Sequence, residues 1–214
     1  MAFIVLGIVL IWAVWMPLCF YCKNRQKRGL SLLFKAAGTL VAVCFAAWGV
    51  LAGGGSLYAR WIWIGLMICT LADILLDIHF LVGGALFLFG QLVYIAAFLT
   101  HTVVWPVSAA LFPVITALLI LFLRKYRSPL PIHLFYNLHM YAFALSAILS
   151  ISIPLPLADP SLNFILGALG AVLFVASDML LLSNSVEKRG FPANFFCLGC
   201  YYMGQLSLAL SAVL

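Results

Sequence analysis

Eight long apolar runs dominate this chain and leave little room for anything else. A helix that crosses a bilayer needs about 20 mostly apolar residues. The runs lie near residues 2–22, 34–52, 60–78, 80–99, 104–123, 133–153, 162–183 and 194–213. Because the chain has only 214 residues, the connections must be short. The pattern predicts an all-α bundle of eight transmembrane helices that forms one integral membrane domain over residues 1–214.

The composition excludes most other classes of protein. Hydrophobic residues make up 67% of the chain and charged residues 7%, whereas a soluble domain is about one-quarter charged. Disordered chains, coiled coils, collagens and disulfide scaffolds are excluded by the same values. Basic residues follow the first run and do not precede it, so this run is predicted to be a retained helix and not a cleaved signal peptide.

The basic residues predict the orientation. Ten of the eleven lie in or beside the first, third, fifth or seventh connection, and only Arg60 belongs to an even-numbered one. The ten are Lys23, Arg25, Lys27, Arg28, Lys35, Arg124, Lys125, Arg127, Lys188 and Arg189. Cytoplasmic loops carry the positive excess, so both termini are expected on the non-cytoplasmic side. Orientation explains the net charge of +6, and no nucleic-acid partner is expected.

Three of the five acidic residues lie inside apolar runs. Asp159 and Glu187 belong to loops, whereas Asp73, Asp77 and Asp178 do not. Asp73 and Asp77 are four residues apart and share a helix face. The predicted topology places all three carboxylates at similar depth near the cytoplasmic side, with Asp178 about one turn from the end of its helix. Ionisable residues at such depth usually face a polar interior.

The carboxylates alone leave three interpretations open. They could form a structural ion-pair network with Lys35, which enters the second span from the same side. They could line a transport path, or they could form an acid and base pair, because nearby carboxyl groups in an apolar setting can differ in protonation.

Other polar residues repeat at helical spacing in the cytoplasmic half. Gln91 and Tyr94 share one face, as do Asn137 and Tyr141, and Gln205 shares a face with Tyr201 or Tyr202. Each pair could supply hydrogen bonds between helices. Together they favour one shared cavity.

The cysteines and histidines do not form a metal motif that outweighs simpler explanations. Cys19 and Cys22, like Cys197 and Cys200, have CxxC spacing at the same predicted face. A four-thiolate zinc site is possible there, although apolar packing, or palmitoylation of the first pair, explains them more simply. Since the histidines lack ligand spacing, no metal or other cofactor is expected.

Four segments follow one another along the chain in a recognisable order and spacing. They are Gly65-Leu66 with Ala72-Asp73-Ile74-Leu75-Leu76, Phe80-Leu81-Val82-Gly83-Gly84 with Phe87 and Tyr94, Gly167-Ala168 with Leu173 to Asp178, and Tyr201-Tyr202-Met203-Gly204-Gln205. Together they resemble the lysoplasmalogenase (YhhN-like) family of multi-pass membrane proteins. The resemblance extends from about Lys35 to the C-terminus. The chain departs from the family pattern at three positions. Ala72 replaces a Gly, Ala36 replaces a Pro, and Gln91 replaces a His and cannot titrate.

The resemblance implies hydrolysis of the vinyl ether bond of lysoplasmalogens to a fatty aldehyde and glycerophosphoethanolamine or glycerophosphocholine. On this interpretation Asp73 and Asp178 are the acid and base in an undetermined order, and Asp77 tunes them. Lys35 binds phosphate or a carboxylate. The head-group side is predicted to include Gln91, Tyr94, Asn137, Tyr202 and Gln205. No metal or redox cofactor is implied.

Two alternatives remain: a small proton-coupled transporter that uses the same carboxylates, and a lipid-binding relative inactivated by Gln91. The expected partners are the lysophospholipid substrate and membrane lipids, and the sequence does not indicate an oligomeric state. Short loops favour a bacterial inner membrane, although an endoplasmic reticulum protein would have a similar pattern.

Overall fold

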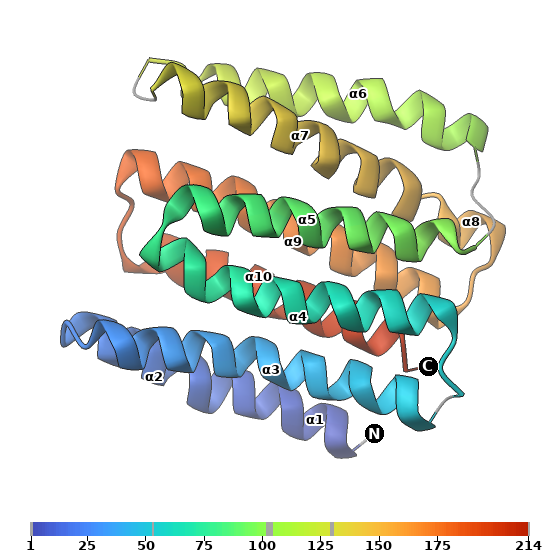
Figure 1. Ribbon diagram of the computed structural model, residues 1–214, viewed down its shortest axis with the longest axis horizontal. Helices are drawn as coiled ribbons and strands as arrows, with labels where there is room; N and C mark the ends of the chain where they lie inside the picture. Colours follow the sequence, from blue (N-terminus) through green and yellow to red (C-terminus); the bar gives the residue numbers. More distant parts are fainter. Residues whose placement is uncertain (1, 53, 102–104, 129–130, 214) are drawn as a thin grey trace.

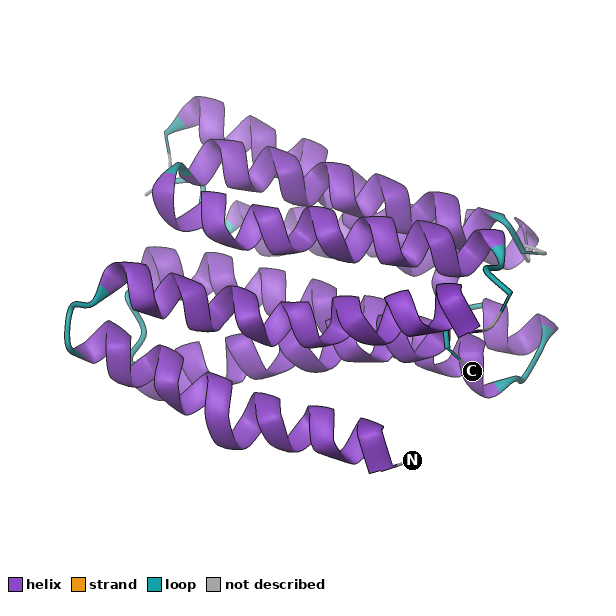
Figure 2. Cartoon of the chain, turned by 60° about the horizontal axis from the view of Figure 1, so that its bottom comes forward, coloured by secondary structure: helices purple, strands orange, loops and turns teal. Residues whose placement is uncertain are grey.

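The fold is a bundle of long helices that run side by side (Figure 1). The computed structural model describes residues 2–52, 54–101, 105–128 and 131–213, so position 104 of the predicted fifth span and the two end residues of the chain lie outside the described residues. Within these ranges every regular element is helical (Figure 2). The elements are α1 (Ala2–Val9), the π-helical turn η1 (Leu10–Trp15), α2 (Met16–Asn24), α3 (Arg28–Ala52), α4 (Leu57–Ile78), α5 (Phe80–Leu99), α6 (Trp105–Arg124), α7 (Ile132–Ser152), the short α8 (Leu155–Ala158), α9 (Leu162–Glu187) and α10 (Phe191–Ser211).

Seven helical stretches are long and apolar enough to cross a membrane, and α1, η1 and α2 contribute to one of them. The chain is therefore a multi-pass helical membrane protein. The remaining long helix, α10, has 21 residues and lies inside the bundle. It is less apolar because it carries polar residues such as Gln205, Ser207 and Ser211, all of which are buried. A crossing by α10 stays a prediction.

Most predicted spans match the helices closely, and α5 coincides with its predicted range of 80–99. The largest differences are at the start of α3 and the end of α9. α3 begins at Arg28 and not at 34, and α9 continues to Glu187 and not to 183. Hydropathy marks only the apolar part of a helix, whereas backbone hydrogen bonds continue through polar residues until the conformation changes. After α9 this change occurs at Lys188, which has a left-handed φ of 49°.

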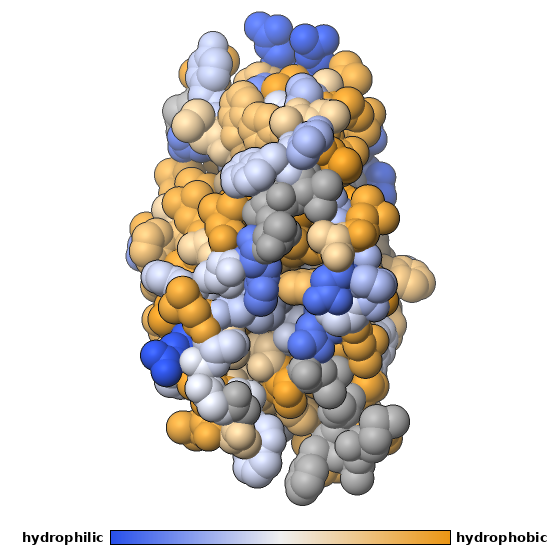
Figure 3. Space-filling view, turned by 90° about the vertical axis from the view of Figure 1, so that its right-hand side faces the viewer, coloured by the Kyte–Doolittle hydropathy of each residue, from blue (hydrophilic) through white to orange (hydrophobic). Residues whose placement is uncertain are grey.

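The basic connections gather at one end of the bundle and both termini lie at the other (Figure 1). The basic end contains the connections from α2 to α3, from α6 to α7 and from α9 to α10. Figure 3 shows the end with the termini, where hydrophilic surface is scattered across the face among apolar residues. The gathering of the basic connections at one end agrees with the predicted arrangement of loops. The side of the membrane that each end faces stays a prediction.

Helices α9 and α10 pack closely because glycines face each other across their contact. A Cβ atom added at Gly170 would lie 2.9 Å from the carbonyl oxygen of Gly204 and 2.7 Å from Cγ of Leu208. A Cβ atom at Gly204 would lie 3.0 Å from the backbone nitrogen of Phe174. Small residues at helix contacts allow such close approach in membrane proteins. The contact sets the distance between α9 and α10, both of which carry residues of the site described below.

We expect Gly170→Ala to lower the thermal unfolding temperature of the purified protein in detergent, because the backbone of α10 cannot easily move away. Overpacking of this kind typically costs about 1–3 kcal/mol. Gly29→Ala is the matched control, since a Cβ atom there meets nothing within 4 Å. Equal unfolding temperatures for the two variants would contradict this account of the α9–α10 contact.

Candidate active site

Asp73 is a buried carboxylate with partners from two neighbouring helices. It lies on α4, and its side chain is 2% exposed. Its Oδ2 atom accepts hydrogen bonds of 2.8 Å from Thr39 of α3 and from the Tyr201 hydroxyl of α10. Its Oδ1 atom lies 3.5 Å from Nζ of Lys35. A buried charge is costly unless it is paired and hydrogen-bonded, and Asp73 satisfies both conditions.

Lys35 joins Asp73 to Asp77. Its Nζ atom lies 3.4 Å from Oδ2 of Asp77, whose side chain is 47% exposed. Because α3 begins earlier than predicted, Lys35 lies about two turns inside this helix and not at its entrance. Asp73 and Asp77 lie one turn apart on α4 and both face Lys35. The structure therefore forms the predicted ion-pair network.

Asp178 has a different environment. It lies on α9, and its Oδ2 atom accepts a 2.6 Å hydrogen bond from the Tyr141 hydroxyl of α7. Within the described residues no cation lies within ion-pair distance of it. Because α9 extends to Glu187, Asp178 lies about two and a half turns before the end of the helix and not one.

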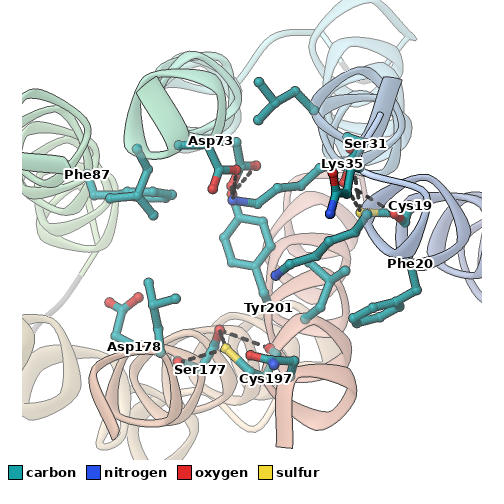
Figure 4. Close-up of a pocket in the computed structure, with 18 residues that line it drawn as sticks. Cys19, Phe20, Ser31, Lys35, Asp73, Phe87, Ser177, Asp178, Cys197 and Tyr201 are labelled. Atoms are coloured by element: carbon teal, nitrogen blue, oxygen red, sulfur yellow. Dashed lines mark hydrogen bonds and ion pairs between the residues drawn. The ribbon is translucent and has the colours of Figure 1, made fainter. Parts of the chain in front are cut away.

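A polar cavity of about 500 Å³ brings the three carboxylates together near the basic end. Figure 4 shows Asp73 and Lys35 on one side, Asp178 on the other, and Tyr201 between them. The lining comes from α2, α3, α4, α5, α9 and α10, with additional residues from the α2–α3 connection. It includes Cys19, Phe20, Lys23, Gln26, Ser31, Lys35, Asp73, Asp77, Phe87, Ser177, Asp178, Asn194, Cys197 and Tyr201.

A second, mostly apolar cavity of about 320 Å³ lies beside the first. Its lining comes from α4, α5, α6, α7 and α9 and is mostly Leu, Phe, Met, Ala and Gly. The two cavities share Leu76, Phe87, Asp178 and Leu181. Asp178 thus lies at the boundary between a polar space and an apolar one. This position could serve a molecule that has one polar end and one apolar end.

A comparison with protein families agrees with the resemblance in the sequence. The model of the YhhN family matches residues 30–212. The chain belongs to the YhhN family. No curated protein sequence and no solved structure matches it. The match begins at residue 30, near the start of α3. Helices α1, η1 and α2, which end at Asn24, therefore lie outside it.

Four residues predicted for the head-group side are enclosed in the packing and do not line either of these cavities: Gln91, Tyr94, Tyr202 and Gln205. The Tyr94 hydroxyl donates a 2.8 Å hydrogen bond to Oε1 of Gln205, and the Tyr202 hydroxyl donates to the backbone oxygen of Lys35. Asn137, the fifth predicted residue, lines the apolar cavity. A substrate-binding role for these five residues stays a prediction.

Gln91, which replaces the His of the YhhN pattern, is fully buried. It lies near the Tyr141 hydroxyl, but neither its amide oxygen nor its amide nitrogen makes a direct hydrogen bond. Gln91 therefore lies beside Tyr141, the residue that donates a hydrogen bond to Asp178.

The predicted site residues do not include three residues that contact the carboxylates directly: Thr39, Tyr141 and Tyr201. Thr39 was detectable because it follows Lys35 by four residues and so shares its helix face. Tyr141 had been grouped with Asn137, and Tyr201 had been left as an alternative to Tyr202. Adjacent tyrosines point in different directions on a helix, and only the packing decides which one reaches Asp73.

Cys19, Cys197 and His101 have structural contacts. Ser31 bonds to the backbone oxygen of Cys19, and Ser177 bonds to that of Cys197. Across the described ranges, no three His, Cys, Asp or Glu residues come together as a metal site requires. His101, near the other end of the bundle, packs against the rings of Tyr58 and Phe164, and burial lowers its pKa below the ordinary value.

We expect Lys35→Met to destabilise the protein strongly, because it leaves the buried Asp73 without a cation. Loss of one partner of a buried pair costs about 3–5 kcal/mol. Addition of Asp73→Asn should restore part of the loss. Thermal unfolding in detergent measures both effects.

Lys125→Met is the matched control, because Lys125 is 61% exposed and pairs with Glu187 near the surface. Such exposed pairs contribute about 0–1 kcal/mol. If Lys35→Met and Lys125→Met lower the unfolding temperature equally, the ion-pair network does not stabilise the bundle as described.

Proposed function

We propose that the chain hydrolyses the vinyl ether bond of lysoplasmalogens and releases a fatty aldehyde and glycerophosphoethanolamine or glycerophosphocholine. Membership of the YhhN family suggests this activity. The observation that carries the proposal is the position of Asp178, where the polar cavity meets the apolar cavity. In a lysoplasmalogen the vinyl ether bond joins the polar glycerophosphate part to a single hydrocarbon chain.

A single-chain lipid fits this arrangement in one orientation. Its head group occupies the polar cavity at the basic end, and its chain occupies the apolar cavity. Leu81 of α5 and Met140 of α7 line the apolar cavity and are 52% and 65% exposed. An opening between these helices would admit the chain from the bilayer. The lipid would then place its vinyl ether bond beside Asp178.

The chemistry requires an acid, a carboxylate and water. When the β-carbon of the vinyl ether is protonated, the π electrons form the new C–H bond, and a lone pair of the ether oxygen is shared with the cationic carbon to give an oxocarbenium ion. Water adds to the cationic carbon and loses a proton to a base. The resulting hemiacetal breaks its bond to the glycerol oxygen, which takes a proton, and the aldehyde leaves. These steps need no oxidant or reductant.

The contacts support one assignment of the two carboxyl groups. Asp73 accepts two hydrogen bonds and lies beside Lys35, and these partners all favour the charged carboxylate. Asp178 has one hydroxyl donor and an apolar side, an environment that favours the protonated form. We assign Asp178 as the acid. Asp73 would stabilise the oxocarbenium ion and accept the proton from water.

Asp77 has a supporting role in this mechanism. It is half exposed at the cavity and shares Lys35 with Asp73. By holding the Lys35 ammonium group between two carboxylates, it would limit how strongly Asp73 is neutralised. The site would face the cytoplasm, since the cavity lies at the basic end and cytoplasmic loops carry the positive excess. We propose a bacterial inner membrane as the location.

We expect the purified protein in detergent to release aldehyde from an alkenyl lysophospholipid in the presence of a metal chelator. In D₂O, the aldehyde should carry one deuterium at the carbon next to the carbonyl, because that carbon receives the proton from Asp178. Mass spectrometry after immediate trapping of the aldehyde measures this label. Turnover without deuterium at that position would contradict the mechanism.

Asp178→Asn should lower the rate about 10²–10⁴-fold, the usual contribution of a general acid or base. Asp159→Asn is the matched control, because Asp159 lies near the opposite end, where its carboxylate accepts a hydrogen bond from the backbone of Ser161. Equal rates for wild type and Asp178→Asn would contradict the assignment.

Two outcomes would favour the alternative functions. If substrate disappears from one compartment only under a proton gradient, the chain is instead a transporter. If only Gln91→His releases aldehyde, the native chain is an inactive relative.

A further inference from the structure

Helix α2 lines one side of the polar cavity, although it precedes the residues that match the YhhN family. Phe20 of α2 packs against Phe191 and Phe195 of α10, with ring centroids 4.9 and 6.0 Å apart. The Ser31 hydroxyl of α3 donates a 3.2 Å hydrogen bond to the backbone oxygen of Cys19. These contacts fix α2 against both helices that flank this side of the cavity.

The last turn of α2 places Lys23 on the cavity lining. The chain then reverses direction through Gln26, which has a left-handed φ of 57° and also lines the cavity. Two backbone hydrogen bonds close this reversal, from Gln26 to Lys23 at 3.1 Å and from Lys27 to Cys22 at 2.9 Å. The backbone that carries Lys23 is therefore held in one conformation.

The two lysines that line the cavity, Lys23 and Lys35, differ in their surroundings. Lys35 lies within 3.5 Å of both Asp73 and Asp77, so its charge is already compensated. Lys23 makes no ion pair with any residue that the structure describes. Among the lining residues it is thus a cation that remains available for an incoming anion, whereas Lys35 is not.

We propose that Lys23 binds the phosphate group of the lipid substrate, a proposal that rests on the function proposed above. A phosphodiester entering the cavity meets Asp73 and Asp77, whose carboxylates oppose a further negative charge. The free ammonium group of Lys23 offsets this repulsion and can donate hydrogen bonds to phosphate oxygens. Because both head groups contain the phosphate, binding through it would not distinguish ethanolamine from choline lipids. The phosphate ligand would then come from the helix that lies outside the family match.

Binding of an uncleavable lipid tests this inference separately from catalysis. A radiolabelled saturated octadecyl-ether glycerophosphocholine has the phosphate but lacks the double bond that the reaction protonates. The matching octadecyl-ether glycerol lacks the phosphate. We expect Lys23→Met to weaken binding of the phospholipid about tenfold or more, and to leave binding of the ether glycerol unchanged. Scintillation proximity with immobilised protein in detergent measures both ligands.

Lys27→Met is the matched control, because Lys27 is exposed just beyond α2 and does not line the cavity. It should bind both lipids as wild type does. Lys23→Arg should retain phospholipid binding, which separates loss of charge from loss of folding. Equal phospholipid binding by wild type and Lys23→Met would overturn the proposal. So would an equal loss for both lipids.

The outcome remains distinct from that of the proposed function. If phospholipid binding depends on Lys23 but wild type releases no aldehyde from the alkenyl lipid, the phosphate site stands and the hydrolase proposal fails. If wild type releases aldehyde and Lys23→Met binds phospholipid normally, the hydrolase proposal stands and the phosphate site fails.

Discussion

The ion-pair network around Lys35 is the interaction on which the site and its surroundings depend. Asp73 is buried in the bundle, where an isolated charge would be very unfavourable. Its partners Lys35 and Thr39 come from α3, and Tyr201 comes from α10. A single carboxylate therefore holds three helices in a specific relation. A shift of any one of them would leave a buried polar group without its partner.

The same requirement explains the contrast between the two buried aspartates. Asp73 has a cation and two hydroxyl donors as partners. Asp178 accepts a hydrogen bond from the Tyr141 hydroxyl of α7, and both residues line the apolar cavity. Within the described residues, the network thus leaves Asp178 without a cation beside the apolar cavity. The two buried aspartates therefore have different partners, and this difference is the basis of the acid and base roles proposed above.

Hydropathy predicted most of the fold because burial of apolar surface decides where helices lie in a membrane. The range of α5 and the gathering of basic connections at one end follow from this rule. The lengths of α3 and α9 do not, since α3 begins with turns that include Arg28 and Ser31, α9 ends with a turn that includes Asn184 and Glu187, and backbone hydrogen bonds continue through these residues. The added turns place Lys35 about two turns inside α3 and Asp178 about two and a half turns before the end of α9.

The site was predictable to the extent that charge is rare in the chain. Asp73, Asp77, Asp178 and Lys35 were identified because charged residues in apolar runs need partners. The choice of Tyr201 over Tyr202 was not predictable, because helical spacing allows either residue to face inward. Nor could spacing reveal the apolar cavity, which exists only where α4, α5, α6, α7 and α9 meet. The boundary position of Asp178 therefore arises from packing between helices distant in sequence, and this position is the reason for proposing a lipid-cleaving site and not only a structural ion-pair network.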